Sequence, residues 1–136
     1  MQPVMMNLWA LLGFVAVRMA VGAIWYGPKT FFPAWSKIVG QTPKDLSKNM
    51  PKAMAADVIG SALMGFVLMH AIAYAGASHD LARGLAVSFM NWLGLVAVVQ
   101  FSATVYEGRP LKFFGITGGY QLVSMLSGGV VLTLWG

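Results

Sequence analysis

The sequence predicts an all-α membrane protein with four transmembrane helices packed as an antiparallel bundle. Four apolar runs, each long enough to cross a bilayer, cover about residues 4–26, 51–75, 81–106 and 113–135 of the 136-residue chain. Hydrophobic residues make up 58% of the chain and charged residues 10%, whereas soluble domains carry about 25% charged residues. A soluble core of this size could not hide so much apolar surface. We therefore expect one transmembrane domain over residues 1–136.

The first span ends at Gly27-Pro28, because proline cannot continue the helical hydrogen-bond ladder. In the connection at residues 27–50, the apolar side chains of residues 31–39 recur at helical spacing. This pattern predicts a short helix that lies either in the plane of the lipid headgroups or against the end of the bundle.

Two signals in the same connection predict helix starts. Thr42-Pro43-Lys44-Asp45 has a capping threonine, a proline at the first helical position and an acid at the third. Asn49 and Pro51 are interpreted as the start of the next helix, which is the second span. The two later connections, at residues 76–80 and 107–112, are short and polar, so they force neighbouring helices to lie antiparallel.

The basic residues predict the orientation in the membrane. One side offers only Arg83, beside Asp80, while the other holds seven basic residues: Lys29, Lys37, Lys44, Lys48, Lys52, Arg109 and Lys112. Because cytoplasmic loops carry the excess of Lys and Arg, we expect a multi-pass protein of the cell (inner) membrane with loops 27–50 and 107–112 in the cytoplasm and both termini outside. No cleavable signal is evident, so the first span is expected to remain in the protein.

Several function classes are disfavoured. The absence of Cys excludes disulfides, thiolate catalysis and Cys-ligated metals. The net charge of +5 does not indicate nucleic-acid binding, because five of the nine basic residues sit in one connection between spans. There is no phosphate loop, nucleophile elbow, catalytic carboxylate pair or metal-ligand cluster. We expect no enzymatic activity, no catalytic residue and no metal site, and the sequence identifies no cofactor.

A weak internal echo relates the first and third spans. Leu12-Gly13-Phe14-Val15-Ala16-Val17 recurs as Leu93-Gly94-Leu95-Val96-Ala97-Val98. One interpretation is a duplication of two tandem hairpins related by a pseudo-twofold axis along the membrane normal. The other is chance, because membrane spans draw on few residue types.

Four motifs are spread over the chain: Trp25-Tyr26-Gly27-Pro28, Ala34-Trp35-Ser36-Lys37-Ile38-Val39-Gly40, Glu107-Gly108-Arg109-Pro110 and Gly118-Gly119-Tyr120-Gln121-Leu122-Val123. Together they resemble a bacterial family of small four-span membrane proteins catalogued as a domain of unknown function. The resemblance implies four membrane helices and supplies no activity. Arg18 and Gln121 depart from the family pattern, which has a small or apolar residue at the first position and commonly a histidine at the second.

One polar group from each span falls at a similar depth. At a helix rise of about 1.5 Å per residue, Arg18, Asp57, Gln100 and Gln121 lie roughly 9–13 Å from the cytoplasmic ends. A charge at such depth should face the bundle and find a partner, and Arg18 with Asp57 is the expected pair. Three interpretations stand side by side: polar contacts that hold helices together, snorkelling of Arg18 to the surface, or a substrate, proton or ion site.

Four other residues are candidates for chemistry. His70 and Asn91 form a predicted polar layer near the outer face, where His70 is a structural residue, a proton relay or a haem ligand. Glu107 and Arg109 flank the cytoplasmic turn, as a gate or docking patch or as parts of a fixed turn.

Small residues recur four apart on every span, which lets helix backbones approach closely. The pairs are Ala16 and Ala20, Ala56 and Gly60, Ser61 and Gly65, Gly84 and Ser88, Gly115 and Gly119, and Ser124 and Gly128. Four short helices cannot bury all these faces internally, so we expect some to meet another subunit.

Three functions follow as hypotheses. The first is a membrane protein without catalytic activity that acts through assembly in the bilayer, as a homo-oligomer or a small subunit of a membrane complex. The second is a small oligomeric transporter or channel built around Arg18 and Asp57. The third is a lipid, quinone or haem binder.

Overall fold

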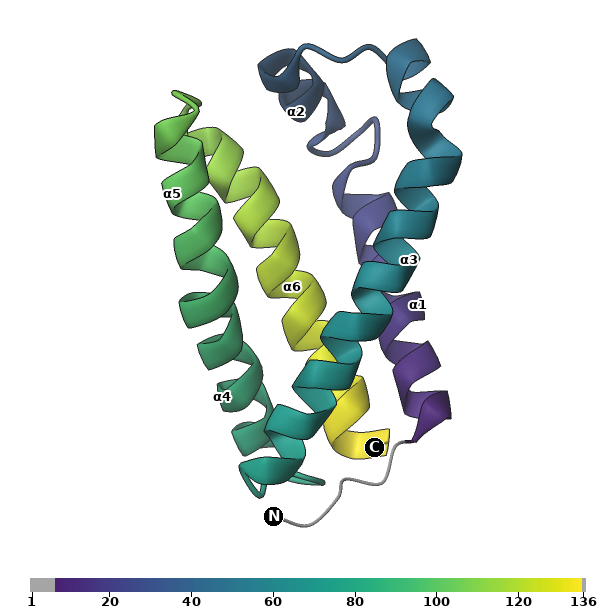
Figure 1. Cartoon of the computed structure of the whole chain (residues 1–136), viewed down its shortest axis with the longest axis vertical. Helices are drawn as coiled ribbons and strands as arrows, with labels where there is room; N and C mark the ends of the chain where they lie inside the picture. Colours follow the sequence, from purple (N-terminus) through teal and green to yellow (C-terminus); the bar gives the residue numbers. More distant parts are fainter. Residues whose placement is uncertain (1–6, 136) are drawn as a thin grey trace.

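Helices make up nearly all of the computed structural model, which describes residues 7–135 (Figure 1). They are α1 (Leu8–Trp25), α2 (Phe32–Val39), α3 (Pro43–Tyr74), α4 (Leu81–Asn91), the π-helix η1 (Trp92–Ala97), α5 (Val98–Tyr106) and α6 (Leu111–Trp135). α4, η1 and α5 follow one another without a break and form one rod of 26 residues. Residues 4–6, at the start of the predicted first span, lie outside the described part of the chain.

Three helical segments are long and apolar enough to cross a membrane, namely α1, α3 and the continuous rod from α4 to α5. Only 17%, 28% and 17% of the residues in their most apolar windows are buried. Most residues in these windows are therefore at least partly exposed, and lipid is an environment in which exposed apolar side chains are favourable. The all-helical, membrane-like part of the fold prediction is confirmed.

The predicted fourth span behaves differently. α6 has 25 residues but is not among the helices that qualify as spans in the described part of the chain. It contacts every other helix, and nine of its residues are buried. Gly, Ser and Thr supply many of these positions, because they let neighbouring helices come close. The central helix therefore meets protein over much of its surface.

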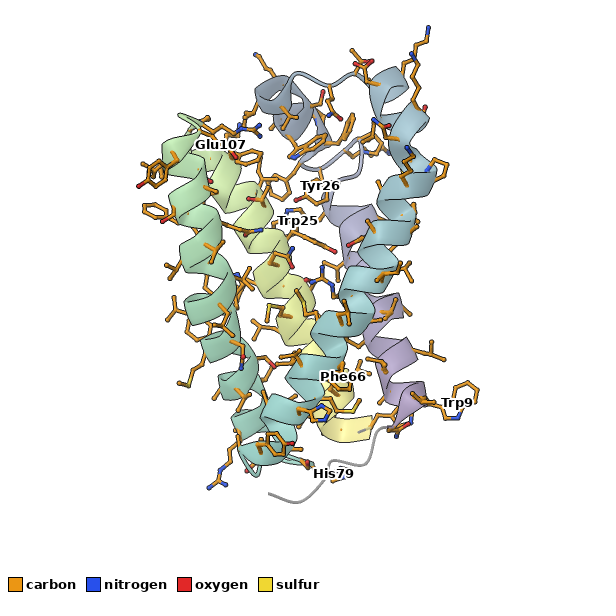
Figure 2. All side chains as sticks on the ribbon, viewed as in Figure 1. Trp9, Trp25, Tyr26, Phe66, His79 and Glu107 are labelled. Carbon is orange, nitrogen blue, oxygen red and sulfur yellow. The ribbon has the colours of Figure 1, made fainter. Side chains whose placement is uncertain are left out.

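The two ends of the molecule are easy to tell apart. Tyr26 and Glu107 lie at one end, together with α2, and Trp9 and His79 lie at the other (Figures 1 and 2). The predicted short helix is present as α2, which contacts α6, and its Trp35 ring lies 6.1 Å from that of Tyr26. It thus packs against the ends of the long helices, and none of its residues is fully buried. Its location in the headgroup plane stays a prediction.

The predicted helix start at Asn49 and Pro51 is wrong. α3 begins at the earlier signal, where the Thr42 hydroxyl accepts from the backbone N–H of Asp45 and the Asp45 carboxylate accepts from that of Thr42. The helix then runs for 32 residues with Pro51 inside it. Proline removes the N–H that would bond the carbonyl of Ser47. Both residues are exposed, so water can take that bond.

Phe14 is the knob that joins α1 to α3 and α6. Its side chain is fully buried between two glycines, Gly65 of α3 and Gly128 of α6. A Cβ on Gly65 would lie 2.7 Å from the Phe14 ring, and one on Gly128 would overlap the ring as well. Only glycine fits either position without a shift of its neighbours. An added Cβ would lie closer to the Phe14 ring than Cβ atoms approach other atoms in proteins, so the helices would have to move apart.

A second close approach joins α4 to α6. Gly84 faces the side chain of Thr133, and Gly129 faces that of Ser88, each too closely for an added Cβ. In the turn before α4, His79 adopts φ 62° and donates its backbone N–H to the Thr133 carbonyl at 2.9 Å. Three of the predicted small-residue pairs, on α3, α4 and α6, are therefore used inside this chain.

The echoed segments differ in local structure. Leu12–Val17 lies in regular α-helix, whereas Trp92–Ala97 is a π-helix that covers most of the second copy. A π-segment accommodates an extra residue in the helix, so the two copies present their side chains differently. The duplication stays a prediction.

Candidate functional site

The candidate site is built around Arg18, a charged residue that is only 3% exposed in the middle of α1. Its Nε donates to the hydroxyl of Ser61 on α3 at 3.0 Å. Its Nη1 donates to the side-chain oxygen of Gln121 at 2.7 Å and to the hydroxyl of Ser124 at 3.1 Å, both on α6. The same nitrogen lies 3.1 Å from the sulfur of Met64. One side chain thus joins three helices.

Tyr120 of α6 completes the lining on another side of the guanidinium. Its ring centroid lies 5.4 Å from the Arg18 Cζ, a cation–π distance, and its hydroxyl donates to the backbone carbonyl of Arg18 at 3.2 Å. Gly22, one turn further along α1, gives the ring room, since a Cβ there would lie 3.3 Å from it. Tyr26 packs on the same ring at 5.4 Å. Aromatic and polar groups therefore line the site toward the end that holds α2.

Asp57 is the carboxylate that balances the buried charge. Its Oδ1 lies 3.9 Å from the Arg18 Nη2, and its side chain is 44% exposed. Within residues 7–135, Nη2 makes no hydrogen bond, so this distant ion pair is its one polar contact. A buried charge needs compensation, and here neutral oxygens supply the short bonds while the carboxylate acts from the edge.

Of the four residues in the predicted polar layer, Arg18 and Gln121 contact each other directly, whereas Gln100 does not join them. Gln121 accepts from Arg18, and Asp57 sits at the edge of the cluster. No hydrogen bond or ion pair connects Gln100 to Arg18 in the described structure. The Gln100 Oε1 is instead buried without a hydrogen-bond partner among the described residues. Equal depth along the membrane does not place two side chains on facing sides of their helices.

Sequence reasoning missed Ser61, Ser124 and Tyr120 as partners of Arg18. Both serines were recognised only as small packing residues. A signal was present, because Ser61 lies four residues after Asp57 and Ser124 lies three after Gln121, which places each pair on one helix face. Arg18 and Gln121 form the shortest hydrogen bond of the site, at 2.7 Å.

The predicted outer layer does not form a joint site. The His70 Nδ1 is 2.8 Å from the Phe66 carbonyl, and the centroid of its ring lies 4.4 Å from that of Phe66 and 5.8 Å, edge-on, from that of Tyr74. The Asn91 Nδ2 donates to the Val87 carbonyl at 2.8 Å. Each side chain bonds its own helix one turn back, so neither reaches the other.

At the turn between α5 and α6, Glu107 and Arg109 form an ion pair at 3.0 Å, and the Arg109 guanidinium lies 4.5 Å from the Phe113 ring centroid. Gly108 between them adopts φ 68°, which glycine takes without strain. These contacts describe a well-defined turn.

An apolar groove of about 280 Å³ runs between α3 and the π-helical part of the following rod. It is lined by Leu63, Met64, Val67, Leu68, Asn91, Leu95, Val96 and Met125. Asn91 is the one residue of this lining with a polar side-chain amide. No group of three or more His, Cys, Asp or Glu side chains that could hold a metal ion occurs within residues 7–135.

The apolar rods and the buried polar cluster define a helical protein of the kind that resides in membranes. The model of a family described as protein of unknown function, DUF1761, matches residues 9–133. The chain belongs to this family. Searches of curated proteins and of solved structures gave no match.

Proposed function

We propose that this chain is a four-span membrane protein without catalytic activity, which acts through assembly in the bilayer with copies of itself or with another membrane subunit. The observation that carries the proposal is a set of small residues that the fold leaves uncovered. Ala16 and Ala20 on α1, and Ala56 and Gly60 on α3, are exposed, and nothing lies within 4 Å of a Cβ built on Gly60. Small residues on a span let another helix approach closely.

The polar cluster supports the same proposal. Arg18 directs its three short bonds to oxygens on α3 and α6, so it holds the chain's own helices together. α6 crosses the bilayer in the middle of the protein, and each long helix runs antiparallel to the one that follows it in the chain. The end that holds α2 faces the cytoplasm, because most of the basic residues lie there.

Native mass spectrometry from mild detergent tests the assembly. We expect a dimer or larger oligomer for the natural chain, and a shift toward monomer for Gly60→Leu, which fills the exposed approach surface. Gly94→Leu is the matched control, because Gly94 is also exposed with open space around it. A natural chain that is monomeric and free of other subunits would refute the proposal.

Cysteine labelling tests the orientation, and the chain has no cysteine of its own to interfere. We expect an impermeant thiol reagent to label Ser78→Cys in intact cells and to label Gly40→Cys only after the membrane is opened. The reverse pattern would overturn the proposed topology.

A small transporter or channel is the second candidate. It is favoured by the partial exposure of Asp57 and by the Nη2 of Arg18, whose one polar contact among residues 7–135 is that carboxylate. Asp57→Asn discriminates between the two functions. Loss of solute or proton movement in liposomes with an unchanged oligomer supports transport, whereas dissociation of the oligomer or loss of folding indicates a structural charge.

The apolar groove favours a third candidate, a lipid or quinone binder. It predicts a bound mass in the same native mass spectrum, and this mass should be lost in Leu95→Trp, which fills the groove. A ligand-free spectrum of the natural chain argues against it.

A further inference from the structure

The net charge of the protein is gathered at one end. Two ion pairs elsewhere cancel, Arg18 with Asp57 at 3.9 Å and Arg83 with Asp80 at 3.6 Å. The remaining charges of the chain belong to α2 and its flanks, to the first turns of α3 and to the turn between α5 and α6. They are seven basic residues and two acidic ones, so this end carries the whole net charge of +5.

Neither acid at this end neutralises a lysine. Glu107 pairs with Arg109 at 3.0 Å. Asp45 accepts hydrogen bonds from the backbone and hydroxyl of Thr42 at 3.1 and 2.9 Å. Lys29, Lys37, Lys44, Lys48, Lys52 and Lys112 are all exposed and form no ion pair within residues 7–135. We define these six residues as the lysine surface.

The lysine surface surrounds a helix with an aromatic edge. α2 holds Trp35 against Tyr26 at 6.1 Å and against Phe32 at 6.0 Å, while Lys37 of the same helix points into the surroundings. Figure 2 shows side chains tipped with nitrogen at this end, near the labelled Tyr26. Tryptophan and lysine next to each other at the end of a span match the headgroup region, where the ring sits among apolar carbons and the ammonium meets phosphate.

We propose that the lysine surface binds the headgroups of anionic phospholipids in the leaflet that faces α2. The proposal rests on the membrane placement proposed above. Unpaired lysines at the bilayer surface attract anionic lipids, and the opposite end has no net charge with which to compete. Headgroup binding would also hold α2 flat against the ends of the long helices.

Tryptophan quenching by brominated lipids tests the proposal in reconstituted vesicles of mixed phosphatidylcholine and phosphatidylglycerol. Two preparations are identical except that bromine is carried by one lipid or by the other. The signal of Trp35 is the difference between the natural chain and Trp35→Phe, and the signal of Trp9, at the opposite end, is obtained from Trp9→Phe. We expect quenching of Trp35 to be about twofold stronger when the anionic lipid is brominated, with no preference at Trp9.

Three comparisons decide the outcome. The preference at Trp35 should vanish in Lys29→Gln/Lys37→Gln, persist in Lys29→Arg/Lys37→Arg, and vanish at about 1 M salt, where the screening length is about 3 Å. Equal quenching of Trp35 by both lipids, or the same preference at Trp9, overturns the lysine surface and leaves membrane insertion intact. Absence of quenching at both tryptophans overturns the membrane placement itself.

Discussion

The Nη1 of Arg18 donates a 2.7 Å hydrogen bond to the side-chain oxygen of Gln121, and this bond joins α1 to α6 inside the protein. A bond from a charged donor to a partly buried amide is among the stronger polar contacts that a fold can contain. It also explains how an arginine can be buried inside the protein, because the central helix α6 supplies an oxygen that accepts its hydrogen bond.

Replacing Gln121 by Leu should destabilise the protein by about 1–3 kcal/mol, since it leaves a buried N–H of Arg18 without its best acceptor. Unfolding in mixed detergent micelles measures the change. Gln100→Leu is the control, because the Gln100 oxygen is buried without a partner in the described structure, and its removal should be neutral or stabilising. Equal losses for the two variants would contradict this account.

Gly128→Ala should cost about 1–3 kcal/mol, because the new methyl group would overlap the Phe14 ring. The double variant Phe14→Leu/Gly128→Ala should recover part of this loss, since a smaller knob leaves room for the methyl group. Gly115→Ala on the same helix has open space around it and should be neutral, or stabilising by about 0.5–1 kcal/mol. Failure of the double variant to recover stability would locate the damage elsewhere.

Pro51→Ala should stabilise the first turns of α3 by about 1–3 kcal/mol, since alanine restores the N–H that bonds the Ser47 carbonyl. Slower hydrogen exchange of the amides near residue 51 is the measurement. Pro43→Ala serves as the control, because Pro43 occupies the first helical turn, where its missing N–H has no helical acceptor. Unchanged exchange near residue 51 would mean that the proline does not limit this part of α3.

The start of α3 should depend on pH through Asp45, which lies ahead of the predicted span. Hydrogen bonds from the backbone N–H and then the hydroxyl of Thr42 lower the pKa of this carboxyl below its ordinary value of 3.8. Because the folded pKa is the lower one, the capping box is fully stabilising above pH 3.8 and is lost as the pH falls through the lowered pKa.

Carbon NMR of the Asp45 carboxyl group measures this pKa directly. Thr42→Ala should raise the pKa part of the way back to 3.8, since the backbone bond remains. A pKa at or above 3.8 in the natural chain would show that the box is not formed.

The cluster around Arg18 shows how far sequence reasoning reaches at a site. The approximate depth of Arg18 and its need for a partner followed from one charge inside an apolar run, and Asp57 was the natural choice because it is the nearest carboxylate by depth. The short bonds go instead to Ser61, Gln121 and Ser124, which are uncharged. A hydroxyl on a membrane helix has many possible roles, so its partner cannot be read from spacing alone.

The sequence by itself determined the helical, apolar character of this protein, a helix start at Thr42 and the family to which it belongs, because composition and local hydrogen bonding suffice for these. Only the tertiary structure decided that α6 lies in the middle, that Phe14 fills the gap between Gly65 and Gly128, and that Pro51 lies within a helix. Small residues and apolar faces are compatible with several neighbours. The choice among them depends on how whole helices pack together, which no local pattern specifies.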